Sequence, residues 1–278
     1  MRIKYLIPIV LLGLLLSGCG KSSKTTENKN ANQAGSKLLI NELPLKDRPF
    51  ITLVPHVTNR LFTFVGLNIN KAKESSIDLE YQSGDLLKGV KANIETPIPE
   101  TYVKAIILGS CSTGGKCSFD KELKTGTTKL RLKFVDQDAT HLLKGDFTFV
   151  TGQPSLPDGK VFFEPSKLTA KENLIMMNSF GLPKPLDKEL VLYPLVFSAT
   201  NNKTISGQLS LTATGVTSAL IYDGTDYQPL KTTTKDGKVI IALNQKPWSM
   251  SAEIIRDDEK GSKESLNLYL VGPIILLK

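Results

Sequence analysis

Histidine, cysteine and tryptophan are scarce in this 278-residue chain, which has two, three and one of them respectively. The histidines, His56 and His141, lack metal-site spacing, and neither lies near the Gly-x-Ser-x-Gly turn of a serine hydrolase. The sequence also lacks a glycine-rich phosphate loop and a dinucleotide fingerprint. We therefore expect a protein without catalytic residues, metal or cofactor. An envelope hydrolase or carbohydrate-active enzyme is the alternative, because two acids facing each other across a cleft leave no sequence motif.

Long hydrophobic runs and helical periodicity are missing as well. Beyond the N-terminal region, no apolar run reaches the roughly 20 residues that a membrane-spanning helix needs. The formal charge of +8 is spread along the chain, without the concentrated basic patch and aromatic platforms typical of nucleic-acid binding. We expect no nucleic-acid partner and an all-β protein, with every element after the N-terminal region outside the bilayer.

The N-terminal region combines charge, an apolar run and small residues in a fixed order. Arg2 and Lys4 precede an uncharged run from Tyr5 to Leu16, which leads into Leu16-Ser17-Gly18-Cys19. This order resembles a bacterial lipoprotein signal with its lipobox. The resemblance implies that residues 1–18 are a cleaved signal peptide and that the Cys19 thiol receives a diacylglycerol. The protein would then be lipid-anchored to the cell membrane on its extracytoplasmic side.

A flexible tether is expected after the lipid anchor, over residues 19–45. Residues 20–36 contain no large apolar side chain, so they cannot offset the entropy cost of ordering. Through the Cys19 lipid, the membrane is one expected partner. An envelope protein or glycan is the other expected partner.

Two cysteines remain once Cys19 carries lipid. Cys111 and Cys117 enclose the pair Gly114-Gly115, so the chain can turn back between them. An exported compartment permits disulfides, and we expect these two to form one. A metal site is the rival interpretation, but it lacks further ligands.

The region 46–164 alternates between apolar and polar residues in short runs separated by glycine, asparagine, aspartate and proline. Ser76–Gln82 and Thr127–Phe134 show the pattern of half-buried strands most clearly. The order of Leu130–Phe134, Asp136–Ala139 and Gly145–Phe149 resembles the late strands of an immunoglobulin-like sandwich. The fold expected here is an antiparallel immunoglobulin-like β-sandwich domain.

A second sandwich of the same type is expected over residues 188–278, after a linker at 165–187. The linker ends in the breaker Gly181-Leu-Pro-Lys-Pro185, and Leu174–Met177 within it suit a short helix or an edge strand. Strand runs then resume, and Asp223-Gly224 supplies a hairpin turn.

Acids and aromatics supply the remaining candidates. Asp136, Asp138 and Asp146 suit a Ca²⁺ site by ligand type, but they lack the spacing of a twelve-residue calcium loop. The aromatic residues Tyr222, Tyr227 and Trp248 are candidates for contact with a ligand, although cross-strand packing is the favoured explanation. We expect a non-enzymatic, lipid-anchored surface protein that acts in adhesion, envelope structure or partner binding.

Overall fold

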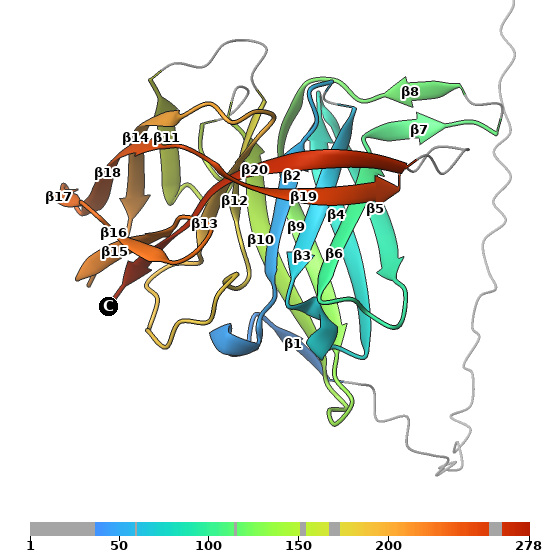
Figure 1. Cartoon of the computed structure of the whole chain (residues 1–278), viewed down its shortest axis with the longest axis horizontal. Coiled ribbons are helices and arrows are strands. Elements are labelled where there is room, and N and C mark those ends of the chain that lie inside the picture. Colours follow the sequence, from blue (N-terminus) through green and yellow to red (C-terminus); the bar gives the residue numbers. More distant parts are fainter. Residues whose placement is uncertain (1–36, 59, 114–115, 151–153, 167–172, 256–262) are drawn as a thin grey trace, which may run out of the picture. The chain divides into compact units, whose positions relative to one another are not determined.

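The computed structural model describes residues 37–58, 60–113, 116–150, 154–166, 173–255 and 263–278, and it confirms an all-β fold with several antiparallel sheets (Figure 1). The largest sheet has eleven strands. They are β1 (Leu38–Ile40), β4 (Glu74–Ser83), β5 (Leu86–Ile94), β9 (Leu123–Lys133), β10 (Thr140–Phe149), β12 (Leu174–Asn178), β13 (Leu195–Ala199), β15 (Ser218–Tyr222), β16 (Tyr227–Leu230), β19 (Trp248–Ile255) and β20 (Lys263–Leu277). Their order is β16-β15-β20-β13-β12-β10-β9-β4-β5, with β1 on β10 and β19 on β20.

Three smaller sheets accompany the large one. The first contains β2 (Phe50–Pro55), β3 (Leu61–Leu67) and β6 (Thr101–Ile107) in the order β2-β3-β6. The second contains β11 (Val161–Pro165), β14 (Ile205–Thr212), β17 (Thr233–Lys235) and β18 (Lys238–Gln245) in the order β11-β14-β18-β17. The third pairs β7 (Gly109–Cys111) with β8 (Cys117–Phe119). The only helical elements in the described ranges are two 3-10 turns, η1 (Leu45–Asp47) and η2 (Ile69–Lys71).

Two hydrophobic cores lie on opposite faces of the large sheet. The first core fills the space between this sheet and β2-β3-β6, and its largest side chains include Phe62, Phe64 and Phe147. The second core lies between the large sheet and β11-β14-β18, around Phe163 and Phe197. Because successive side chains of a strand point to opposite faces, one sheet can serve both cores.

Strand β12 is where the two cores meet. Ile175 and Met177 belong to the first core, while Leu174 and Met176 belong to the second. All five residues of β12 are buried, and the strand pairs with β10 on one side and β13 on the other. A strand buried on both faces is a continuous apolar run without alternation, which explains why the sequence leaves both a short helix and an edge strand open here.

The segment 165–187 was expected to be a linker, with a short helix or an edge strand in it. In the structure Leu174–Asn178 is a strand inside the large sheet, so it is neither a helix nor an edge strand, while the linker bounds stay a prediction. Within the range 19–45 expected to be a tether, β1 pairs with β10 in parallel and Leu43 lies in the first core. The division into domains 46–164 and 188–278 stays a prediction, as does their immunoglobulin-like identity.

The hairpin of β19 and β20 further links the two halves. In Figure 1 this red hairpin extends from the C-terminal half over the strands of the first small sheet, and β19 contacts β6 while β20 contacts β2. Leu268 and Leu270 of β20 are buried in the first core, whereas Ile274 and Leu276 are buried in the second. The sequence suggests two strands, 266–271 and 273–277, where the structure has one continuous strand.

Candidate functional site

The predicted anchor falls in a part of the chain that the structure does not describe. Cys19, the signal peptide 1–18 and most of the tether lie outside the described residues, so the lipid attachment stays a prediction. Within the described residues, no helix has the length and apolar character needed to cross a membrane.

The predicted disulfide between Cys111 and Cys117 is confirmed, with an S–S distance of 2.06 Å. The two cysteines lie directly opposite each other on β7 and β8, and both are exposed. A bridge across a six-residue separation joins neighbouring strands of one hairpin. It therefore stabilises this hairpin locally and connects no distant parts of the fold.

The three aromatic residues proposed as ligand contacts lie together. The Tyr222 ring centroid is 5.4 Å from that of Tyr227 and 5.6 Å from that of Trp248. Their polar atoms are bonded to the backbone, because the Tyr227 hydroxyl donates to the Lys184 carbonyl at 2.7 Å and Trp248 Nε1 donates to the Gly272 carbonyl at 2.8 Å. The Tyr222 hydroxyl donates to its neighbouring turn in the same way.

This bonding indicates that the aromatic cluster packs the β15–β16 hairpin against the start of β19. Gly224 is in the left-handed region with a φ of 100°, and a Cβ atom there would lie 2.7 Å from Trp248 Cβ. Burial raises the pKa of the Tyr227 hydroxyl above its ordinary value, so this group stays a hydrogen-bond donor. No ligand is needed to explain these contacts, and ligand contact stays a prediction.

The acids considered for Ca²⁺ are not gathered by the fold. Asp136 and Asp138 are exposed in the β9–β10 loop, whereas an oxygen of Asp146 accepts a hydrogen bond from Thr127 at 2.8 Å. Within the described ranges, no three side chains of histidine, cysteine, aspartate or glutamate lie close enough to hold a metal ion.

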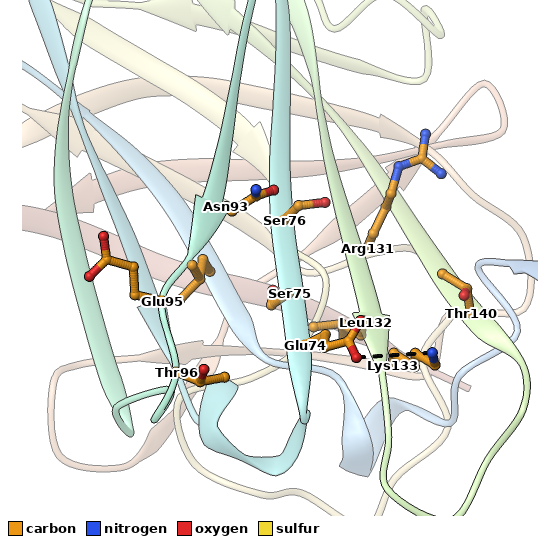
Figure 2. Close-up of a pocket in the computed structure, with 11 residues that line it drawn as sticks. Glu74, Ser75, Ser76, Asn93, Glu95, Thr96, Arg131, Leu132, Lys133 and Thr140 are labelled. Carbon is orange, nitrogen blue, oxygen red and sulfur yellow. Dashed lines mark ion pairs between the residues drawn. The ribbon is translucent and has the colours of Figure 1, made fainter.

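A pocket with a volume of about 670 Å³ lies on the large sheet of the first half, where strands β4, β5, β9 and β10 begin or end (Figure 2). It lies at the strand ends, where both faces of the sheet contribute: Ser75, Ile94 and Leu132 are on the core side, and the residues next to them are on the outer side. It is lined by Glu74, Ser75, Ser76, Asn93, Ile94, Glu95, Thr96, Arg131, Leu132, Lys133 and Thr140.

Charges of both signs surround this pocket. Arg131 Nε lies 3.4 Å from a carboxylate oxygen of Asp78, and Lys133 Nζ lies 4.0 Å from one of Glu74. In Figure 2 the Glu74 carboxylate points toward Lys133, while that of Glu95 points away from it on the other side of the pocket.

Neutral hydrogen-bonding groups occupy the centre of the pocket. Ser76 and Asn93 are directly opposite each other on β4 and β5, and Ser76 is also opposite Arg131 on β9. Ser75, on the buried side of β4, has a hydroxyl without a hydrogen-bond partner among the described residues. The site therefore offers amide, hydroxyl and guanidinium groups to a ligand with many polar atoms.

Sequence reasoning did not identify these residues. The outward-facing positions of β4 and β9 are visible in the alternation, but the sequence does not tell which strands are neighbours in the sheet. Strands β4 and β9 pair across about fifty positions of the chain, as in Asp78 with Lys129. Comparison of the chain with family models, curated proteins and solved structures finds no match, so its own geometry carries the functional argument.

Proposed function

We propose that the chain is a lipid-anchored, non-enzymatic binding protein on the extracytoplasmic side of the cell membrane. The lipobox-like Leu16-Ser17-Gly18-Cys19 supports the anchor. The β architecture supports a role in adhesion or partner binding, and immunoglobulin-like sandwiches are the finer form that we propose for it. Diffusion at the envelope surface would bring such a protein into contact with polysaccharide and other surface polymers.

The pocket of Figure 2 is the observation that carries this proposal. Its neutral residues Ser76, Asn93 and Thr96 match hydroxyl and amide groups, while Arg131 suits a carboxylate. Envelope glycans present this combination of groups. We therefore propose that this pocket binds a glycan without cleaving it.

Fatty-acid labelling tests the anchor. Cells expressing the protein incorporate labelled palmitate into it, and Cys19→Ala removes the label. Cys111→Ser is the matched control, because this cysteine lies in the exposed β7–β8 hairpin and should leave labelling intact. Equal labelling of the wild type and Cys19→Ala would refute anchoring at this residue.

Sedimentation with isolated envelope glycan tests the binding face. The double variant Ser76→Ala/Asn93→Ala removes a cross-strand pair from the pocket and should weaken binding by about tenfold, from two hydrogen bonds of about 0.5–1.5 kcal/mol each. Ser251→Ala/Asn267→Ala is the matched control, because these residues form an equivalent cross-strand pair on β19 and β20.

Three results would contradict the proposal. Equal loss in both double variants would show that the pocket is not the binding surface, and absence of sedimentation of the wild type would remove the glycan as its ligand. Release of soluble fragments from the glycan by the purified protein would favour the enzyme class over the binding class.

A further inference from the structure

A second pocket lies where the two halves of the described chain meet, and it differs in character from the polar one. Its volume is about 480 Å³, within the range of about 300–1,000 Å³ that is usual for small-molecule sites. Its walls come from η1, the start of β11, the end of β12 and the segment that leads into β13. It is lined by Leu45, Arg48, Asp158, Lys160, Val161, Asn178, Lys188, Glu189, Leu190, Val191, Leu192, Tyr193 and Pro194.

The segment 188–194 is held in place by the end of the chain. Leu190 forms a β-bridge with Leu277, and the Val191 N–H donates to the Leu276 carbonyl at 2.9 Å. The Lys278 N–H donates to the Glu189 carbonyl at 3.1 Å. Backbone bonds therefore fix the mostly apolar wall of the pocket, so little ordering is required when a ligand enters.

Arg48 is oriented toward this pocket before any ligand binds. Its Nε donates to the Leu43 carbonyl at 2.5 Å, and its Nη2 donates to the Asn41 carbonyl at 2.7 Å. Its guanidinium lies 5.4 Å from the ring centre of Tyr193, which is 38% exposed. A guanidinium has five N–H donors, so the two backbone bonds leave others for an anion.

Positive charge exceeds negative charge around the pocket. Lys160 and Lys188 are exposed, and neither they nor Arg48 forms an ion pair with a described residue. Of the two lining carboxylates, Glu189 pairs with Lys278. Asp158 accepts a hydrogen bond from the backbone N–H of Lys160 at 3.0 Å.

One neutral polar side chain also lines this pocket. Asn178, the last residue of β12, is only 8% exposed, and it lines the pocket. Its carboxamide forms no hydrogen bond with another described residue. A carboxamide both donates and accepts hydrogen bonds, so it supplies a specific contact for a ligand.

From these observations we infer that this pocket binds a small amphipathic organic acid. The apolar part contacts Leu190, Val191 and Tyr193, and the carboxylate lies among Arg48, Lys160 and Lys188. The Asn178 carboxamide adds a hydrogen bond to the ligand. This site is separate from the glycan-binding face, and neither proposal depends on the other.

Calorimetry with 4-phenylbutyrate tests this inference. The intact protein is placed in phosphatidylcholine nanodiscs, with empty nanodiscs as the blank. The neutral 4-phenylbutanol and the cationic 4-phenylbutylamine share the apolar part of the probe. We expect the affinity to fall in the order carboxylate, alcohol, amine. The result that would overturn the inference is equal affinity for all three, or no heat beyond that of empty nanodiscs.

Matched variants locate the binding. Lys160→Gln/Lys188→Gln should weaken 4-phenylbutyrate binding about fivefold and leave 4-phenylbutanol unchanged, since exposed charge pairs contribute modestly to affinity. Lys235→Gln/Lys238→Gln makes the same change of net charge on exposed strand positions outside the pocket, and it should have no effect. Equal weakening in both variants would reduce the effect to overall charge and would refute the site.

Discussion

Met176 and Met177 are adjacent in β12, but each fills a different core, so they can show whether the two halves unfold together. Both side chains are completely buried, Met176 in the second core and Met177 in the first. Replacing either by alanine removes a buried side chain and leaves a cavity, at a cost of about 2–5 kcal/mol. With a urea m-value of about 3 kcal/mol/M, a loss of about 3 kcal/mol lowers the unfolding midpoint by about 1 M.

The assay compares two probes in the same urea titration. Fluorescence reports on Trp248, which packs against the first core, and far-UV circular dichroism reports on all strands. Because β12 and the β19–β20 hairpin contribute to both cores, we expect one transition, shifted similarly by Met176→Ala and Met177→Ala.

Independent sandwiches would behave differently. Two separate transitions, with each variant affecting only one, would refute the view that the shared sheet joins the two halves into a single cooperative unit.

Three further predictions follow from single contacts. Cys111→Ser/Cys117→Ser should cost at most about 2 kcal/mol in chemical unfolding, because the closed loop is short; a larger loss would show a wider role for the hairpin. Gly224→Ala should lower the melting temperature, because it adds a Cβ atom 2.7 Å from Trp248 Cβ. Gly159→Ala, also at a positive φ but with no atom within 4 Å of the added Cβ, should lower the melting temperature less. Raising the pH above about 10 should destabilise the protein. Burial and the Asp120 hydrogen bond raise the pKa of the Tyr81 hydroxyl in the folded state, so the unfolded chain loses this proton at a lower pH. Tyr81→Phe should reduce this part of the pH dependence.

Alternation along the chain was sufficient to predict the strands that have one buried face. In β4, the apolar residues Ile77, Leu79 and Tyr81 are buried and the acids between them face outward, as the sequence indicates. The disulfide was predictable for a similar reason, because Cys111 and Cys117 are close in the chain and their pairing needs only a local turn. Both features depend on short-range patterns, which a sequence displays directly.

Long-range pairing was not predictable in the same way. Leu174–Asn178 is uniformly buried, so it lacks the alternation that would identify it as a strand, and its neighbours β10 and β13 come from different regions. The sequence contains the aromatic residues of the cluster but does not show that they are neighbours. Trp248 lies next to Tyr222 because β15 and β19 both pair with β20. The two pockets were not predictable for the same reason, because each forms where strands that are distant in the sequence lie side by side.

The position of β12 also has a consequence for binding. Its last residue, Asn178, lines the second pocket, which lies where the two halves meet. Met176 and Met177 connect the same strand to both cores. A ligand that bonds to Asn178 and to the segment 188–194 therefore contacts β12, the strand whose side chains belong to both cores. If the halves unfold as one unit, such a ligand stabilises the whole described fold by mass action. Binding at this pocket should then raise the single midpoint and leave no part of the transition unchanged.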